Sequence, residues 1–234
     1  MMDEMLTTLR SGLPMLGLDL PEDAQQNLCR FGCAVVKQNE VMNLTAITAP
    51  DQVAKLHLLD SLSVLKAADL AGKSVIDVGC GAGFPGVPLA IAEPELKVTL
   101  LDSLGKRVKW LEEVLPTLGV RAQCATGRAE EYVACCREQY DVATSRAVAR
   151  LNILLELTAP FVKVGGAVLA MKGSAAREEL DEAKNAIKRL GLKLEKVAQF
   201  PVDGTAHTVI VLRKVKPTPP KYPRRYAKIK QQPL

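Results

Sequence analysis

With 234 residues, 48% of them hydrophobic, the chain is long enough for one substantial water-soluble domain plus an appended segment. No apolar run approaches the roughly 18 to 20 residues of a membrane span, and residues 1–17 lack a signal-peptide pattern, so we expect a cytoplasmic protein. The net charge of +5 conceals an asymmetry, because residues 204–234 hold eight Lys or Arg and no acid, which leaves 23 basic and 26 acidic residues elsewhere. A basic arm on a mildly acidic body indicates a polyanionic partner, and a solubilising tail is the alternative.

The first 68 residues predict a small helical region. One helix begins at residues 21–23 and another after Pro50. Their apolar stripes are Leu28, Phe31, Val35 and Val36 in the first, and Val53, Leu56, Leu59 and Leu62 in the second. We interpret residues 1–68 as N-terminal helices that precede a main domain over residues 69–214.

From Lys73 onward, short apolar runs alternate with helical periodicity. The candidate strands are SVIDVG from Ser74, KVTLLD from Lys97, VRAQCAT from Val120, YDVATS from Tyr140 and AVLAMK from Ala167. This alternation predicts βαβ units, and near-continuous apolar strands predict a parallel sheet covered by helices on both faces.

The last two candidate strands break this rhythm. LKLEKVAQF from Leu192 and HTVIVLRKV from His207 are separated only by the Pro201 to Thr205 connection, and so short a link requires antiparallel pairing. A mostly parallel sheet that ends in an antiparallel hairpin is typical of the seven-stranded, Rossmann-like class I S-adenosylmethionine-dependent methyltransferase fold, an α/β architecture. The five prolines from Lys214 onward predict that residues 215–234 form a basic, disordered tail on what is otherwise a single structural unit.

A glycine-rich loop, Val75 to Gly86, follows the first strand and opens a helix. Read from Gly79, the dinucleotide fingerprint has Phe84 in place of its third glycine; read from Gly81, G-x-G-x-x-G is complete, which leaves a nicotinamide or flavin cofactor open. Asp102 ends the next strand, where a carboxylate accepts both ribose hydroxyls. A simple helix-terminal acid is the alternative for Asp102.

Acidic residues around this loop favour S-adenosylmethionine. That ligand has no pyrophosphate, only an amino acid head, a sulfonium and an adenosine, so Asp77, Asp102 and Glu130 are tolerable beside it. Glu130 follows the third strand within Gly127-Arg-Ala129-Glu130, at the expected position of the adenine amine. An acidic first turn that complements the helix dipole is the alternative for Glu130.

The six cysteines include no C-x2-C pair. Cys29 and Cys33 lie one helical turn apart, but no second pair or nearby histidine completes a metal site. We therefore expect reduced thiols and no bound metal.

Eight short motifs occur in order from about residue 40 to the C-terminus. They are Asn43-Leu-Thr45, His57-Leu-Leu-Asp60-Ser61, DVGCGAGFPGVPLA from Asp77, Asp102-Ser-Leu-Gly-Lys106-Arg107, Gly127-Arg-Ala-Glu-Glu131, Ser145-Arg146-Ala-Val-Ala, Met171-Lys172-Gly173 and Tyr222-Pro-Arg224-Arg225. With these motifs the chain resembles the bacterial small-subunit (16S) ribosomal RNA guanine-N7 methyltransferases, long called the glucose-inhibited division protein B family.

The resemblance implies S-adenosylmethionine as cofactor and 16S rRNA as substrate, either naked or within the small ribosomal subunit or its assembly intermediate. It points to guanine 527, in the 530 loop, as the modified base. The expected cofactor-binding residues are Gly79, Gly81, Phe84, Asp102, Ala129, Glu130 and Arg146. We expect a monomer with no obligate protein partner.

The expected reaction site has no general base. Exocyclic-amine methyltransferases carry Asn or Asp followed by two prolines after the fourth strand, whereas this chain has Ser145-Arg146-Ala147-Val148. Guanine N7 presents a bare lone pair, so no proton must leave before attack. We expect Arg146 to position the substrate, through guanine O6 or a phosphate, or to hold the cofactor carboxylate.

Basic residues near the loop and in the tail are the candidates for RNA contact. They are Lys106, Arg107, Lys172, Lys221, Arg224, Arg225 and Lys228, with the rings of Tyr222 and Tyr226 available to unstacked bases. For Lys106 and Arg107 a solvated helix face is the alternative. We hypothesise that the tail is disordered in the free protein and becomes ordered on RNA.

Some assignments stay open at this point. His57 and Asp60, one helical turn apart, form either a catalytic pair or a packing contact at the cleft floor, and His207 fits a structural role in its strand. Besides an RNA methyltransferase, two function classes are compatible with the pattern: a nicotinamide-dependent oxidoreductase and an RNA-binding protein without turnover.

Overall fold

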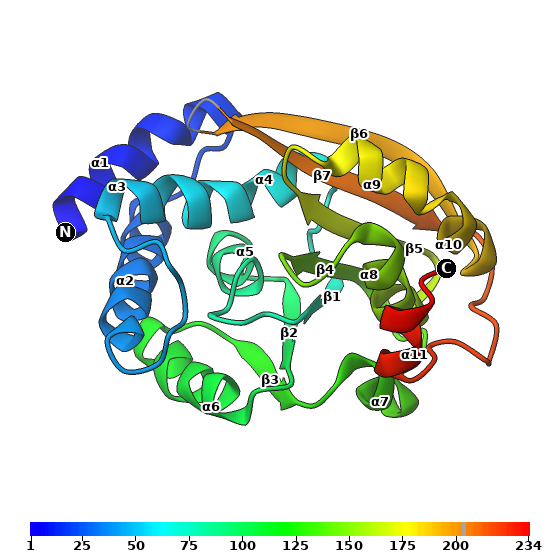
Figure 1. Ribbon diagram of the computed structural model, residues 1–234. Helices are drawn as coiled ribbons and strands as arrows, with labels where there is room; N and C mark the ends of the chain where they lie inside the picture. The colour runs from blue at the N-terminus through cyan, green and yellow to red at the C-terminus, as the bar shows by residue number, and fades with distance from the viewer. Residues whose placement is uncertain (203–204) are drawn as a thin grey trace.

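The computed structural model describes residues 1–202 and 205–234, and its centre is a seven-stranded sheet (Figure 1). The strand order is β3-β2-β1-β4-β5-β7-β6. The strands are β1 (Ser74–Val78), β2 (Lys97–Asp102), β3 (Ala122–Thr126), β4 (Tyr140–Arg146), β5 (Val162–Lys172), β6 (Leu192–Val202) and β7 (Thr205–Lys214). Strands β1 to β5 are parallel, and β7 runs antiparallel between β5 and β6. The predicted fold class is therefore confirmed, although residues 203 and 204 of the predicted connection lie outside the described part of the chain.

Helices cover both faces of the sheet. On one face lie α1 (Met2–Gly12), α2 (Glu22–Asn39), α3 (Pro50–Val53), the π-helical η2 (Ala54–Leu59), α4 (Asp60–Ala67), α5 (Gly86–Ala92) and α6 (Gly105–Val114). On the other lie α7 (Ala129–Tyr132), α8 (Leu151–Thr158), α9 (Ala176–Glu182) and α10 (Lys184–Arg189). Short 3-10 turns are η1 (Pro14–Leu16), η3 (Leu115–Leu118), η4 (Val133–Cys135) and η5 (Ala159–Phe161), and the chain ends in α11 (Tyr226–Gln231). Along the described residues, no helix is both long and apolar enough to cross a membrane.

The apolar strands contribute side chains to two separate cores, because successive side chains of a strand point to opposite faces of the sheet. Val75 and Leu169 belong to the core under the N-terminal helices, whereas Ile76 and Val168 belong to the core under α8 and α10. The N-terminal helices thus share a continuous apolar core with the sheet. Boundaries at residues 68 and 214 stay a prediction.

The prediction of a disordered C-terminal tail is wrong, because buried partners hold it. Lys214 is fully buried, and Tyr222 and Ile229 are buried as well. Arg137 donates to the tail carbonyls of Thr218, Pro219 and Tyr222. The prediction assumed that all basic residues of this region are solvated. In the structure, Lys214 and Arg224 instead have hydrogen-bond and ion-pair partners within the protein.

Candidate functional site

The candidate site lies at the carboxyl ends of β1 and β4, the point where the strand order reverses and where open α/β sheets form a ligand crevice. Ser145 at the end of β4 donates its hydroxyl to the Val78 carbonyl at 2.7 Å, which ties the two strand ends together. Two cavities open here, of about 210 and about 400 Å³, and Val148 lines both. Five of the seven residues predicted to bind the cofactor, and Lys172, line one or the other.

Four of the seven residues predicted to bind the cofactor line the smaller cavity, whereas Gly81 and Phe84 do not and Arg146 lines the larger one. Gly79, Asp102, Ala129 and Glu130 line the smaller cavity, together with Tyr226. Asp102 is 6% exposed, and its two carboxylate oxygens accept the backbone N–H groups of Gly81 and Leu104 at 2.8 and 2.9 Å. These two hydrogen bonds fix the carboxylate in place. Each oxygen has a second lone pair, so the group can still accept hydrogen bonds from hydroxyls.

Gly79 and Gly81 of the glycine loop both have positive φ, and Gly79 also leaves no room for a side chain. Gly79 has φ +73°, and a Cβ at this position would lie 2.5 Å from Val148 Cγ2. Gly81 has φ +56°, where side chains are strained, and its Cβ position lies 3.9 Å from Arg107 Nη1. Arg107 therefore reaches the loop, whereas Lys106 is exposed.

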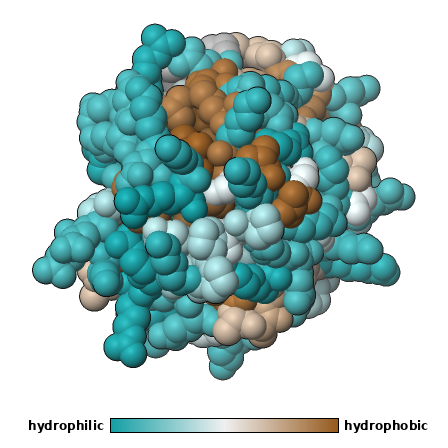
Figure 2. Space-filling model, turned by 90° about the vertical axis from the view of Figure 1, so that its right-hand side faces the viewer, coloured by the Kyte–Doolittle hydropathy of each residue, from teal (hydrophilic) through white to brown (hydrophobic). Residues whose placement is uncertain are grey.

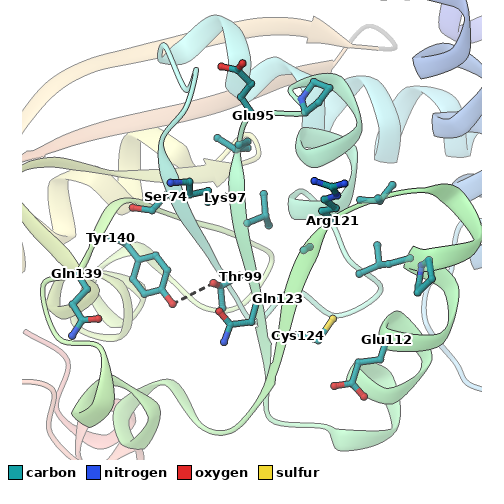
Figure 3. A pocket seen from close by; sticks show the side chains of 17 residues that line it. Ser74, Glu95, Lys97, Thr99, Glu112, Arg121, Gln123, Cys124, Gln139 and Tyr140 are labelled. Atoms are coloured by element: carbon teal, nitrogen blue, oxygen red, sulfur yellow. Dashed lines mark hydrogen bonds between the residues drawn. The ribbon is translucent and has the colours of Figure 1, made fainter.

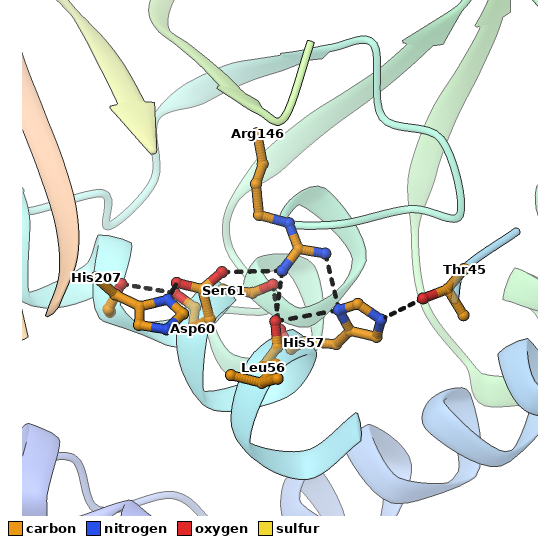
Figure 4. Close-up of polar contacts among 8 residues, drawn as sticks. Thr45, Leu56, His57, Asp60, Ser61, Arg146 and His207 are labelled. Carbon is orange, nitrogen blue, oxygen red and sulfur yellow. Dashed lines mark hydrogen bonds and ion pairs between the residues drawn. The ribbon is translucent and has the colours of Figure 1, made fainter. Parts of the chain in front are cut away.

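Arg146 lines the larger cavity and is held in a cluster of polar contacts (Figure 4). Its Nη1 donates to the Leu56 carbonyl at 2.8 Å and to Asp60 Oδ2 at 2.9 Å, and its Nη2 lies 3.1 Å from His57 Nδ1. The guanidinium carbon lies 5.1 Å from the centre of the Phe84 ring. Phe84, predicted to bind cofactor, is 4% exposed and supports Arg146 and His57 with its ring.

The π-helical turn η2 explains why a helix carbonyl is available to Arg146. In an α-helix the N–H of Asp60 would bond to the Leu56 carbonyl, but here it bonds to the carbonyls of Lys55 and His57. The Leu56 carbonyl instead accepts from Arg146. Such widened turns recur at functional sites, and no sequence pattern pointed to this one.

The protonation states of the cluster follow from its contacts. His57 Nδ1 lies 3.1 Å from both Arg146 Nη2 and the Leu56 carbonyl oxygen. A guanidinium only donates, so the tautomer that accepts from Arg146 carries its proton on Nε2, which then donates to Thr45 Oγ1 at 2.8 Å. Burial, with the charge of Arg146, lowers the pKa of His57 to about 4, so the ring is neutral at pH 7. Burial alone would raise the pKa of Asp60, but hydrogen bonds from His207 and Arg146 outweigh it and bring that pKa below its ordinary value. His57 and Asp60 therefore orient Arg146, and neither is free to act as a base.

Asp77 lies beneath the loop with an incomplete set of partners. Its Oδ2 accepts the Gly86 N–H at 2.8 Å, while Oδ1 has no hydrogen-bond partner among the described residues. Burial raises the pKa of this carboxyl to about 7. An acidic group in this condition is stabilised by a nearby cation.

Comparison with known proteins decides the family. A model of the family described as GidB, rRNA small subunit methyltransferase G, matches residues 24–207. The chain belongs to the rRNA small subunit methyltransferase G family. Proteins named ribosomal RNA small subunit methyltransferase G are similar over nearly their whole length: 45% identity in Alkaliphilus metalliredigens, with 93% of each chain covered, and 40% in Clostridium botulinum (strain Loch Maree / Type A3), with 99% of each covered.

Solved structures agree on the fold. TYW2 of M. jannaschii, in complex with AdoMet, superposes with a TM-score of 0.54 at 15% identity, covering 67% of this chain and 77% of that one. TrmN from Thermus thermophilus superposes with a TM-score of 0.53 at 20% identity, covering 67% of this chain and 48% of that one. At these identities the likeness shows a shared fold.

In this member of the rRNA small subunit methyltransferase G family, two residues predicted to contact RNA have partners within the protein. Lys172 is paired with Glu179 at 2.8 Å, with its side chain only 7% exposed. Arg224 is bound to the fully buried Glu156. Tyr222, expected to stack on bases, is 3% exposed.

The remaining predicted RNA contacts are open. Lys221, Arg225 and Lys228 are exposed on the C-terminal segment. Figure 2 shows the side of the molecule that carries this segment, where hydrophilic residues surround a smaller hydrophobic area. RNA contact by these three side chains, and by Lys106 and Arg107, stays a prediction.

A further hollow of about 900 Å³ lies at the opposite edge of the sheet, where β1 to β4 begin (Figure 3). Its labelled charged residues have both signs: two are acidic, Glu95 and Glu112, and two are basic, Lys97 and Arg121. It contains none of the predicted site residues.

Sequence reasoning missed one contributor to the site and gave two others a different role. Ala147 has φ +56°, a conformation uncommon for a residue with a side chain, and it turns the chain between Arg146 and Val148. Tyr226 was assigned to RNA, yet it lines the smaller cavity. Asp60 was noticed as a neighbour of His57, but nothing in the sequence links it to Arg146, 86 positions away.

Proposed function

We propose that this protein transfers the methyl group of S-adenosylmethionine to N7 of a guanine in 16S rRNA, at guanine 527 of the 530 loop. Membership of the rRNA small subunit methyltransferase G family supports the reaction and the RNA class. The observation that carries the choice of atom is the site itself: a cavity lined by Asp102 and Glu130 adjoins one lined by Arg146, and neither His57 nor Asp60, which contact that arginine, is free to act as a base.

The residues around the smaller cavity fit the cofactor. Asp102 would accept the ribose hydroxyls, Ala129 and Glu130 would face the adenine, and the buried Asp77 favours a nearby positive charge. When bound, S-adenosylmethionine supplies an electrophilic methyl group on a sulfonium. Gly79 and Gly81 let the backbone approach it closely.

Arg146 is the proposed substrate-positioning residue. Its contacts with Leu56, Asp60 and His57 use three of five N–H donors, so two are left for a ligand. Bonding to guanine O6 or a phosphate would hold the base while leaving the N7 lone pair unobstructed. Alignment of the nucleophile, rather than proton removal, is therefore the main contribution of this chain.

The exposed cations of the C-terminal segment and of α6 are the proposed phosphate contacts. If they bind RNA, affinity falls as salt rises, because each contact releases counterions. We propose that the protein acts in the cytosol without an obligate protein partner, on naked rRNA or on a ribosomal particle.

The test is methyl transfer from labelled S-adenosylmethionine to small subunits and to naked 16S rRNA, followed by nuclease digestion and mass spectrometry. We expect 7-methylguanosine at one position, and a loss on the order of 100-fold for Arg146→Ala, comparable to removing one preorganised donor. Arg189→Ala, an exposed arginine on α10, is the matched control. RNA binding without label in either substrate, or label on another atom, would contradict the proposal.

A further inference from the structure

The C-terminal segment, residues 215–234, is built into the fold beside the cofactor cavity. Its helix α11 packs on α8 and lies close to α7 (Figure 1). Tyr222 and Ile229 give it a small apolar footing. The family model ends at residue 207, so this segment lies beyond the matched range.

Two cations fix the path of the chain up to Tyr222. Arg137 donates to the carbonyls of Tyr222 and Thr218, each at 2.8 Å. Lys214, without exposed surface, donates to Thr218 Oγ1 at 2.6 Å and pairs with Glu138 at 3.0 Å. Hydrogen bonds to charged groups are directional, so they define where the chain goes next.

A third cation orients the start of α11. Glu156 of α8 accepts the backbone N–H of Arg224 at 2.8 Å and its Nε and Nη2 at 2.8 and 2.6 Å. A two-pronged guanidinium contact together with a backbone contact sets both position and direction. Tyr226 follows two residues later, so the contacts of Arg224 also determine where Tyr226 lies.

The placement brings Tyr226 to the boundary between two hollows. It lines the 210 Å³ cavity with Asp102 and Glu130. It also lines an adjoining groove of about 610 Å³, to which Arg225 and Lys230 contribute. Glu130 lines both as well, so Tyr226 stands on the Glu130 side of the cavity.

We propose that Tyr226 forms the outer wall of the S-adenosylmethionine site on its adenosine side, so that the C-terminal segment completes this site; the inference rests on the proposed function. A tyrosine ring offers a flat face to a purine and a hydroxyl to a polar edge. Asp102 marks the ribose end of the cavity, and the neighbouring Glu130 marks the adenine end. The ring is therefore a cofactor contact, and only the charged side chains of the segment are left for RNA.

The test is titration calorimetry of S-adenosylhomocysteine into the full chain and its Tyr226→Ala, Tyr226→Phe and Gln231→Ala variants. We expect Tyr226→Ala to weaken binding on the order of tenfold, as loss of one aromatic stack does. Tyr226→Phe keeps the ring, and Gln231 is exposed on the same helix outside both hollows, so both variants should bind within about twofold of wild type. In turnover, Tyr226→Ala should raise the KM for S-adenosylmethionine more than it lowers kcat.

Hydrogen exchange of the wild-type protein distinguishes a direct cofactor contact of α11 from a folding defect of the Tyr226→Ala variant. S-adenosylhomocysteine should slow amide exchange in α11 and leave α10 unchanged. Unchanged exchange in α11, or a Tyr226→Ala variant that binds as tightly as wild type, overturns the inference while the proposed function stands. A wild-type protein that binds no S-adenosylhomocysteine overturns both.

Discussion

The two ends of the chain both reach the cleft, but different forces hold them there. The N-terminal helices bury Met5, Phe31 and Leu62 completely in a core shared with the sheet. The C-terminal segment buries little apolar surface and depends on polar contacts with Arg137, Glu156 and the buried Lys214 at the end of β7. Apolar packing is non-directional and spread over many residues, whereas a buried ion pair fails when one partner is lost. The N-terminal region should therefore tolerate single substitutions better than the C-terminal segment.

Two buried carboxylates show the same contrast at the level of single atoms. Glu156 is 0% exposed and receives three donors from Arg224. Asp77 is also 0% exposed but receives one donor, from Gly86, and keeps an oxygen without a partner in the described structure. A charge is thus well compensated under the C-terminal segment and poorly compensated under the glycine loop.

The largest expected effect comes from Arg224→Ala, which removes the guanidinium that anchors the C-terminal segment to Glu156. It leaves Glu156 buried without a countercharge, at a cost of about 3 to 5 kcal/mol in the free energy of unfolding. Urea denaturation at neutral pH measures this loss, with Arg225→Ala, an exposed neighbour, as control. A loss no larger than that of the control would show that the segment is held by its apolar contacts.

The second expected effect is a pH dependence of stability that comes from Asp77, the poorly compensated carboxylate. Burial raises the pKa of Asp77 from 3.8 to about 7, although the Gly86 N–H and the charge of Arg146 oppose the shift. Between these values the unfolded chain has released a proton that the folded protein keeps, so the free energy of unfolding falls as pH rises. Asp77→Asn removes this titration and keeps an acceptor for Gly86. We expect the stability gap between variant and wild type to widen in favour of the variant, by on the order of a few kcal/mol across this window.

The measurement is urea unfolding of both proteins at several pH values across the window. His57, whose pKa is lowered to about 4, opposes the trend because it makes stability rise with pH from about 4 toward its ordinary value of 6.5. It is present in both proteins, so it cancels in the difference. A gap that does not change with pH would mean that Asp77 is compensated by something else.

The elements that sequence predicted share a local signal. Alternation of apolar runs and helical stripes located the strands, and the short connection before His207 implied the antiparallel end of the sheet. Gly79, Asp102 and Glu130 follow three different strands, and the carboxyl ends of parallel strands meet at one edge. Their convergence on one cavity could therefore be predicted without knowing any side-chain contact.

The parts that were missed depend on pairs distant in sequence. Arg224 and Glu156 are 68 positions apart, and Arg146 and Asp60 are 86 apart. Neither partner has a local pattern that distinguishes it from a solvated charge. Composition counts Lys214 as part of a soluble tail, whereas the fold gives it three acceptors and no exposed surface. For that reason the tail was expected to be disordered, and Tyr226 was assigned to RNA.

The smallest expected effect tests whether the N-terminal region supplies more than packing. Asp60→Asn keeps the size of the side chain but removes the charge that faces Arg146 and His207. Because the Leu56 carbonyl still holds the guanidinium, Arg146 should be loosened rather than lost, and we expect a fall in kcat on the order of tenfold. Binding of S-adenosylhomocysteine should stay within about twofold, since Asp60 does not line the cofactor cavity. Asp69→Asn, an exposed acid just after α4, is the matched control. Equal kcat in both variants would reduce the role of the N-terminal helices to packing, whereas a selective loss in Asp60→Asn would show that apolar packing places a charge where the reaction needs it.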